Sequence, residues 1–435
     1  MEIKDEIKNE IKNEIKNGNF FFFGCWNRRE SIIKEGKVIE TVNTCTDIVV
    51  ENIKSSSIKY DFGIILGDNI YPDEKKVEKI KGGEKGEKIF TVEKMTDGMK
   101  LLNSIGLPLH IVLGNHDIEH CEMLNIQMKN LELENWKFNS NLYSNTYKYN
   151  KYNIRSIIID TNVISSYNPF VEKIPITEYD LLKIKNCDFV GENVKNNKLI
   201  IEPNTYYTKF KEMLTVVNNE NINLIIISGH EPLLCGKAVK DTVQANLLRD
   251  AHPVSKNKVK KTEMLFLNDL MESIELLNKK NIKVVYICAD THCFLDTVIK
   301  QGDALLRQII VGTGGAAPDV FTKEFIENIK NKKEGYSITQ TEGTKIAQLF
   351  IKCVINSYGY CSFNIEKFMT ETETTTIEND DLCMNNERSI IYVHNPKNTL
   401  EKPCLEKSRE QTAGNNKYYE YLTLRQKYRL LKNKI

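Results

Sequence analysis

The sequence has no apolar run near the roughly 18 residues that a membrane-spanning helix needs, and no apolar core of signal-peptide length follows Met1. It also has no CxxC pair, because its 11 cysteines are scattered, and their number is odd. These absences argue against a membrane span, a secretory signal and a disulfide framework. We therefore expect a protein of a reducing compartment, the cytoplasm, with no membrane partner.

The chain also has no large excess of charge of either sign. The 60 Lys and Arg residues nearly cancel the 59 Asp and Glu residues, so no strong field marks the chain as a nucleic-acid binder. The basic stretch at residues 256–261 has no regular aromatic interleaving, and we interpret it as solvated surface. With 435 residues, of which 41% are hydrophobic, the chain is long enough to bury a large core.

Composition divides the chain into four parts. Residues 1–17 form a low-complexity charged tail with isoleucine at every fourth position, and we expect it to be solvated and partly helical, or else an interaction helix. Residues 18–369 form the main domain, and residues 370–381 form an acidic linker. Residues 382–435 form a C-terminal extension whose basic amphipathic segment at 418–431 could dock on the body or on a protein partner.

Short apolar, β-branched runs recur along the main domain and predict strands. They lie at residues 20–23, 64–66, 109–113, 154–159, 224–227, 284–288 and 309–311. Helical periodicity lies between several of them, as at residues 264–278, where leucine and isoleucine keep the three-and-four spacing of one helical face. Strands that alternate with helices predict an α/β layer fold, in which ligands gather beyond the strand ends.

Four short segments that carry metal-ligand side chains follow such runs. They are Leu-Gly-Asp-Asn-Ile-Tyr at 66–71, Leu-Gly-Asn-His-Asp at 113–117, Ser-Gly-His-Glu-Pro at 228–232 and Ala-Asp-Thr-His at 289–292. Each segment alone is compatible with an ordinary turn. The chain has only 7 histidines, however, and three of them occupy equivalent strand ends. Hard oxygen donors mixed with imidazole are what a two-metal phosphoester site needs.

The side chains of the first two segments suggest distinct roles. Asp68, in the turn after a strand, can bridge two cations, and Tyr71 can reach the same centre as a phenolate. Asn115 offers a neutral carbonyl oxygen to a cation that already holds anionic ligands. His116 would then meet the substrate, and Asp117 could orient the His116 ring by accepting a hydrogen bond from it.

The last two segments add further candidate ligands. Gly229 allows a close backbone approach just before His230. Asp290 and His292 alternate across Thr291, so in an extended chain both face one side and can serve two adjacent cations.

This series resembles the calcineurin-like metallophosphoesterase superfamily, and its purple acid phosphatase branch in particular. Residues 67–71 fit the motif GDxxY, residues 114–117 fit GNH[DE], and residues 227–230 fit VxxH loosely. The resemblance covers roughly residues 18–370. It implies an α/β fold of two packed mixed β-sheets flanked by helices, which is a four-layer sandwich.

The resemblance also implies a ligand set for two divalent or mixed-valence metal ions, of Fe, Zn or Mn. The first ion would be held by Cys25, Asp68, Tyr71 and His292, and the second by Asp68, Asn115, His230 and Asp290. His116 would stabilise or protonate the leaving oxygen, with Asp117 beside it.

Two positions depart from the pattern of the family. Cys25 replaces a ligand carboxylate, and a thiolate is a softer donor that would shift the metal preference. Asn27, two residues on, could offer its carbonyl oxygen instead. Asp290 stands in for an imidazole, and its negative charge would tighten cation binding but weaken the attraction for an anionic phosphate.

The expected function is hydrolysis of phosphomonoesters at a binuclear metal site, either acid-phosphatase-like or phosphoprotein phosphatase-like. The substrate would be a phosphorylated small molecule or a phosphoprotein, and cleavage of phosphodiesters is a second enzymatic interpretation. The alternative is a catalytically weak or inactive member of the fold that binds metal, phosphate or a partner without turnover.

Overall fold

The computed structural model describes most of the main domain and little of the two ends. The described residues are 13–27, 30–34, 37–42, 46–71, 73–74, 88–89, 92–118, 123–124, 126–127, 133–164, 194–195, 198–199, 203–215, 221–237, 242–245, 259–316, 336–338, 347–355, 358–370 and 390–391. The predicted linker beyond residue 370, and the C-terminal extension apart from residues 390–391, lie outside them. Within these ranges, no helix combines the length and the apolar character needed to cross a membrane.

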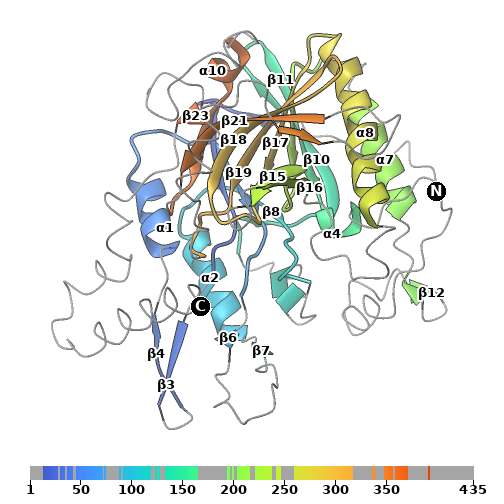
Figure 1. The fold of residues 1–435 in the computed structure, drawn as a ribbon. Coiled ribbons are helices and arrows are strands. Elements are labelled where there is room, and N and C mark those ends of the chain that lie inside the picture. Colours follow the sequence, from blue (N-terminus) through green and yellow to red (C-terminus); the bar gives the residue numbers. More distant parts are fainter. Residues whose placement is uncertain are drawn as a thin grey trace.

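Two mixed β-sheets lie at the centre of the molecule (Figure 1). The nine-stranded sheet has the order β1 (Asn13–Glu14), β10 (Leu142–Tyr149), β11 (Tyr152–Ile159), β14 (Leu224–Ser228), β17 (Lys283–Cys288), β19 (Ala304–Val311), β18 (Phe294–Gln301), β21 (Ala347–Ile355) and β20 (Tyr336–Ile338). The six-stranded sheet has the order β23 (Ile390–Ile391), β22 (Cys361–Asn364), β2 (Asn19–Phe23), β5 (Phe62–Leu66), β8 (Leu109–Val112) and β9 (Trp136–Lys137).

The central strands of each sheet run parallel. In the nine-stranded sheet, β11, β14, β17 and β19 are consecutive parallel neighbours. In the six-stranded sheet, β2, β5 and β8 are parallel. The carboxyl ends of parallel strands lie at the same edge of a sheet, so the turns that follow these strands gather there.

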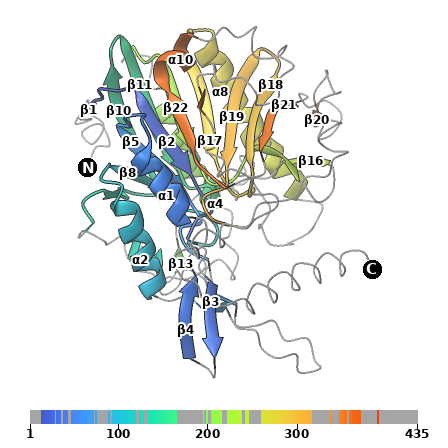
Figure 2. The ribbon, with the colours of Figure 1, turned by 90° about the vertical axis from the view of Figure 1, so that its left-hand side faces the viewer.

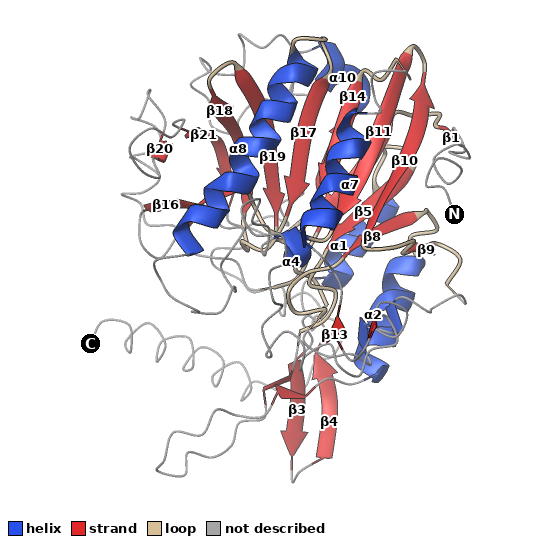
Figure 3. Cartoon of the chain, turned by 90° about the vertical axis from the view of Figure 1, so that its right-hand side faces the viewer, coloured by secondary structure: helices blue, strands red, loops and turns tan. Residues whose placement is uncertain are grey.

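Helices cover the outer faces of both sheets. Figure 2 shows α1 (Thr46–Ser55) and α2 (Val92–Asn103) beside the six-stranded sheet, and Figure 3 shows α7 (Pro203–Thr215) and α8 (Val259–Asn278) in front of the nine-stranded sheet. The short helices are α4 (Thr161–Ile164) and α10 (Ile365–Thr370). Four hairpins complete the described elements: β3 (Glu30–Lys34) with β4 (Lys37–Val42), β6 (Asp73–Glu74) with β7 (Lys88–Ile89), β12 (Val194–Lys195) with β13 (Lys198–Leu199), and β15 (Leu234–Lys237) with β16 (Thr242–Ala245). The four layers confirm the predicted fold class.

Alternation along the strands builds two cores from one sheet. On β14, Leu224 and Ile226 join the core that lies between the sheets, whereas Ile225 and Ile227 join the core beneath α7 and α8. Successive side chains of a strand point to opposite faces, and both faces of this sheet are covered, so every residue of β14 is buried. A sheet covered on both faces explains why its strands appear as unbroken apolar runs.

The predicted strands and helix are confirmed. The run at residues 20–23 lies in β2, where all four phenylalanines have no exposed surface. Phe20 stacks on Phe62 of β5 with ring centroids 5.0 Å apart. The helical pattern at 264–278 falls within α8.

The end of the predicted tail is a strand docked on the main domain and not part of a helix, while the side chains of Glu14, Lys16 and Asn17 are exposed, as expected of a solvated segment. Residues 13–14 form β1 and pair in parallel with β10, and Ile15 is buried in the core between the sheets. The backbone N–H groups of Lys16 and Asn17 donate to the Asp61 carboxylate at 3.0 and 3.1 Å. The open edge of β10 and this carboxylate supply hydrogen-bond partners that the repeat itself does not reveal. Residues 1–12 lie outside the described part of the chain.

Candidate metal centre

Main-chain hydrogen bonds tie the turns of the two sheets to one another. The N–H of Cys25, after β2, donates to the carbonyl of Gly67, after β5, at 3.0 Å. The N–H of Gly24 donates to the carbonyl of Val311, at the end of β19, at 2.8 Å. The second bond joins the six-stranded sheet to the nine-stranded sheet. The turns at the strand ends of both sheets are therefore joined to one another by backbone hydrogen bonds.

Two glycines let the turns after β5 and β8 approach closely. Gly67 has a φ of +84°, and a Cβ there would lie 2.6 Å from the backbone nitrogen of Gly114 and 2.7 Å from Nδ1 of His230. A Cβ on Gly114 would overlap the backbone nitrogen of Asp68. Gly67 needs glycine both for its left-handed backbone and for the space around it, whereas Gly114 needs glycine for the space alone.

Three candidate ligands have a left-handed backbone conformation. The φ angles are +54° at Cys25, +52° at Asp68 and +50° at Asp290, and each residue is the second after the end of a strand. Asp tolerates this conformation better than most residues, and Cys has no such tolerance. Strained φ values of this kind cost about 1–3 kcal/mol each and gather at functional sites. The three turns therefore keep a strained backbone while directing their side chains to one place.

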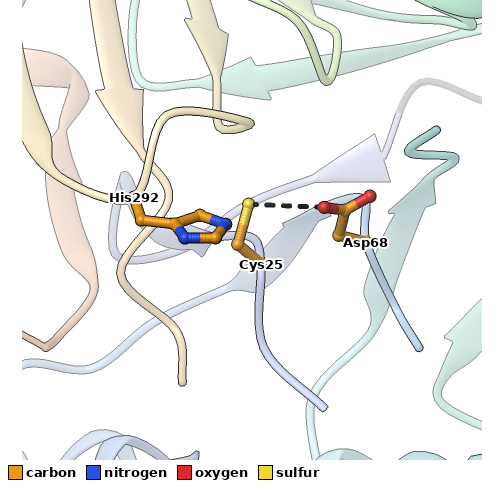
Figure 4. A group of neighbouring side chains, drawn as sticks. All are labelled: Cys25, Asp68 and His292. Carbon is orange, nitrogen blue, oxygen red and sulfur yellow. Dashed lines mark hydrogen bonds between the residues drawn. The ribbon is translucent and has the colours of Figure 1, made fainter. Parts of the chain in front are cut away.

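One oxygen of Asp68 faces a group made of Cys25, Tyr71 and His292. The hydroxyl of Tyr71 donates to Oδ2 of Asp68 at 2.8 Å and lies 3.1 Å from Nε2 of His292. The thiol of Cys25 donates to the same Oδ2 at 3.9 Å (Figure 4). One donor atom from each of Cys25, Asp68 and His292 lies within 4.8 Å of the others, which is close enough to hold one ion. We call these side chains the cysteine half.

The other oxygen of Asp68 faces a group made of Asn115, His230 and Asp290, the histidine half. Nδ1 of His230 lies 2.7 Å from the carbonyl oxygen of Leu66, and because a carbonyl only accepts, Nδ1 carries the proton. In the neutral ring Nε2 then has a lone pair, which lies 3.1 Å from Oδ1 of Asn115 and 3.3 Å from Oδ1 of Asp68. Oδ1 of Asp290 is 4.0 Å away.

The arrangement around His230 has the form of a metal ligand. Ligand histidines almost always donate their other N–H to a carboxylate or carbonyl, which fixes the ring. Here that partner is the carbonyl of Leu66. In the neutral form of the ring, the Nε2 lone pair would be repelled by the three oxygen atoms that it faces, and a cation placed between them would turn the same contacts into attraction.

Burial and charge set the protonation of the acidic side chains. Although burial raises the pKa of Asp68, the neighbouring His230 and His116 and the Tyr71 hydroxyl together lower it, so this carboxylate is ionised. Burial, followed by the charges of Asp68 and Asp290, raises the pKa of the Cys25 thiol. Burial, followed by Asp68, raises the pKa of the Tyr71 phenol. Without a cation, the thiol and the phenol therefore stay protonated.

Asp117 holds the turn after β8. Its carboxylate accepts hydrogen bonds from the backbone N–H of Gly114 at 2.7 Å and of Asn69 at 2.9 Å. The amides of Asn69 and Gln127 donate to it at 3.1 and 3.0 Å. Burial, followed by Asp68, raises the pKa of Asp117 to about 7. These four bonds use both oxygens, and they favour support of the turn over the expected role of orienting His116.

Two residues of this hydrogen-bond network, Asn69 and Gln127, were not predicted from the sequence to have a role. Asn69 accepts a hydrogen bond from the indole of Trp26 at 2.8 Å and donates to Gln127 at 2.9 Å. Asn69 lies inside the first motif, so its place in the turn was a signal for it. Gln127 lies outside every motif, and nothing in its sequence context marks it.

His116 lies at the border of the centre. Its backbone N–H donates to Oδ1 of Asp68 at 3.2 Å, and its ring centroid is 4.9 Å from that of Tyr71. Asp68 is 2% exposed, whereas His116 is only partly buried. The residue as a whole is thus more exposed than Asp68, although Nδ1 of its ring is buried.

Asn27 packs against α2. Its amide nitrogen donates to the carbonyl oxygens of Asn69 at 2.9 Å and Lys94 at 3.4 Å. A Cβ on Gly98 of α2 would lie 2.6 Å from Oδ1 of Asn27. These contacts favour a packing role for Asn27 over the expected alternative of a metal ligand.

The residues present fit divalent metal ions. All seven side chains predicted as ligands come from turns at this edge of the two sheets: Cys25, Asp68, Tyr71, Asn115, His230, Asp290 and His292. They supply carboxylate and amide oxygens, imidazole nitrogens, a phenol and a thiol, which are the donor types that Zn²⁺, Fe and Mn²⁺ accept.

The fold and this donor set are those of a metal-dependent phosphoesterase. The family model described as calcineurin-like phosphoesterase matches residues 24–294, which is more than half of the chain. The chain therefore belongs to the calcineurin-like phosphoesterase family, and membership implies divalent metal ions and a phosphorylated substrate. The range includes Cys25, at its start, and His292, near its end.

Other comparisons are more distant. No curated protein sequence matches the chain. One solved structure that matches is described as "Structure of PhoD", with 10% sequence identity and a TM-score of 0.40. The match covers 79% of this chain and 63% of that chain, so this chain spans less than two thirds of the length of that protein.

Proposed function

We propose that this protein hydrolyses phosphomonoesters at a binuclear metal site bridged by Asp68. The supporting observation is the position of this carboxylate between two donor groups. Oδ2 lies beside Cys25 and Tyr71, and Oδ1 lies beside His230. A carboxylate in this position can give one oxygen to each of two cations.

The chain's own residues would divide the work of the reaction. Cys25, Asp68, Tyr71 and His292 would hold one ion, and Asp68, Asn115, His230 and Asp290 would hold the other. Two bound ions would polarise the phosphoryl oxygens and lower the pKa of a water molecule. His116, partly exposed beside Tyr71, would donate a proton or a hydrogen bond to the leaving oxygen. Asp117 would keep the Asn115 turn in place through its bonds to Gly114 and Asn69.

The charge of the donor set supports a second candidate, which is metal binding without efficient turnover. Cys25, Asp68 and Asp290 are all buried and each would carry a negative charge when a cation is bound. Every added negative charge weakens the attraction for a phosphate dianion. A protein of this kind would bind two metal ions and release no phosphate.

Turnover by the metal-loaded full chain separates the two candidates. The protein is freed of metal with a chelator, reloaded with Mn²⁺, Zn²⁺ or Fe, and assayed with p-nitrophenyl phosphate and with its bis-ester. We expect faster cleavage of the monoester. A preference for the bis-ester would instead support a phosphodiesterase, and two bound ions with no cleavage of either substrate would support the binding protein.

Asp68→Asn is the variant that tests the bridging role. Losing several kcal/mol of charge stabilisation lowers the rate by about a thousandfold, so we expect kcat/KM to fall at least that far. The matched control is Asp303→Asn, which removes an exposed carboxylate from the turn between β18 and β19. The control should keep the activity of the original protein. An Asp68→Asn variant with full activity would contradict the proposal.

A further inference from the structure

The two halves of the candidate centre differ in the softness of their donors. The cysteine half contains a thiol sulfur, a phenol and an imidazole, from Cys25, Tyr71 and His292. The histidine half contains an imidazole, an amide oxygen and a carboxylate, from His230, Asn115 and Asp290. Sulfur selects thiophilic ions such as Zn²⁺ and iron, whereas oxygen donors suit harder ions such as Mn²⁺ and Mg²⁺.

The backbone keeps the sulfur of Cys25 at the centre. The N–H of Cys25 donates to Gly67, and its carbonyl accepts the N–H of Ala316 at 2.8 Å. Both bonds are formed while Cys25 stays in the left-handed region, with no exposed surface. A cysteine that served only as a small core residue would gain nothing from this conformation, since Cys is not among the residues that tolerate it.

The contacts of the sulfur are polar. Sγ lies 3.9 Å from Oδ2 of Asp68, and Figure 4 shows the thiol between this carboxylate and the ring of His292. Three other buried cysteines have neutral oxygen partners. The Cys288 and Cys361 thiols donate to the backbone carbonyl oxygens of Ile309 and Ser362 at 3.7 and 3.8 Å, and Sγ of Cys235 lies 3.1 Å from the hydroxyl oxygen of Thr291. The sulfur of Cys25 differs from these three because its partner is an ionised carboxylate.

We propose that the centre sorts two different cations, with a thiophilic ion bound through the sulfur of Cys25 and a harder ion bound in the histidine half. The shared Asp68 contributes one oxygen to each half, so the remaining donors decide which ion each half prefers. When the thiophilic ion binds, the thiol proton leaves to solvent and the sulfur forms the bond to the ion. This inference rests on the proposed binuclear site but makes no use of turnover.

X-ray absorption at the zinc edge tests the inference directly. The full-length protein, freed of metal, is given one equivalent of Zn²⁺ followed by an excess of Mn²⁺. We expect one sulfur scatterer at about 2.3 Å from zinc. A zinc shell of nitrogen and oxygen alone would overturn the proposal. The measurement uses the original protein and therefore does not depend on a variant that might misfold.

Two variants sharpen the result. Cys25→Asp replaces the thiol with a carboxylate, which should remove the sulfur scatterer and lower the preference for Zn²⁺ over Mn²⁺ by at least about tenfold, because even second-shell changes alter metal affinity 10- to 100-fold. Cys361→Ala removes a buried thiol in β22 and should leave both the scatterer and the preference unchanged. An unchanged preference in Cys25→Asp would contradict the sorting.

The test is independent of the proposed function. Zinc–sulfur coordination in a protein that does not cleave p-nitrophenyl phosphate would support the sorting and contradict the phosphatase. Turnover by a centre whose zinc has no sulfur ligand would support the phosphatase and contradict the binding of different ions in the two halves. Cys25 would then act only as a core residue.

Discussion

Two buried aspartates show how differently one fold accommodates a negative charge. Asp296 lies in the middle of β18, and the guanidinium of Arg307 on β19 donates to its two oxygens at 3.0 and 2.7 Å. Asp68 lies after β5, where its contacts are a hydroxyl, a backbone N–H, a thiol and an imidazole. The first carboxylate is neutralised by a cationic side chain of its own chain. The second is arranged so that added cations would complete its neutralisation.

The largest effect on stability is expected at the pair within the sheet. Asp296→Asn would leave the Arg307 charge buried without its carboxylate, and breaking a buried pair costs about 3–5 kcal/mol of unfolding free energy. Denaturant unfolding of metal-free protein measures the loss. Asp68→Asn, measured in the same way, should cost less, because it leaves no cationic partner of this kind behind. Equal losses in the two variants would remove the distinction.

Metal ions should reverse the comparison. At a free ion concentration 100 times the Kd, binding to the folded state alone adds about 2.7 kcal/mol for each site. We expect Mn²⁺ or Zn²⁺ to raise the Tm of the original protein and of Asp296→Asn, and to raise that of Asp68→Asn much less. Thermal unfolding with and without a chelator gives the three shifts. A shift in Asp68→Asn as large as in the original protein would contradict the role of Asp68.

A third buried group shows another solution, which is to stay neutral. His110 on β8 lies 2.6 Å from the hydroxyl of Tyr147, and burial, followed by the charge of Lys137, lowers its pKa from 6.5 to about 4. The unfolded chain then binds a proton below pH 6.5 that the folded protein does not bind until about pH 4. The contribution of the neutral His110 ring to the unfolding free energy is therefore complete above pH 6.5, and it is lost as the pH falls towards 4.

His110→Gln should remove this dependence. The original protein is expected to lose about 2 kcal/mol between pH 7 and pH 5 through this one group, and the variant should lose that much less over the same range. Urea unfolding at both pH values, without metal, measures the difference. Identical pH dependence in the two proteins would show that His110 is as easily protonated in the folded state as in the unfolded chain.

The sequence revealed those parts of the fold whose signal is local. Apolar runs located β2, β5, β8, β14 and β17, because strands buried on both faces need no partner to be recognised. The turn motifs then located Asp68, His230 and Asp290, since each is the second residue after the end of such a strand.

The parts that were missed depend on distant partners. β18 contains Asp296, whose charge hides a buried strand until Arg307 is placed beside it. β1 is recognisable only once β10 offers it an edge. Gln127 contributes to the centre through Asn69 and Asp117, and only the folded chain brings these three together. Local patterns therefore predicted the candidate ligands better than the residues that support them.

Anomalous X-ray scattering from crystals soaked in Zn²⁺ and Mn²⁺ shows whether two metal ions bind on either side of Asp68. We expect two peaks, about 3.5–4 Å apart, one on each side of Asp68. The zinc peak should lie beside Cys25 and the manganese peak beside His230. A single ion that leaves Asp68 uncoordinated, or peaks only at the protein surface, would contradict the proposed binuclear site.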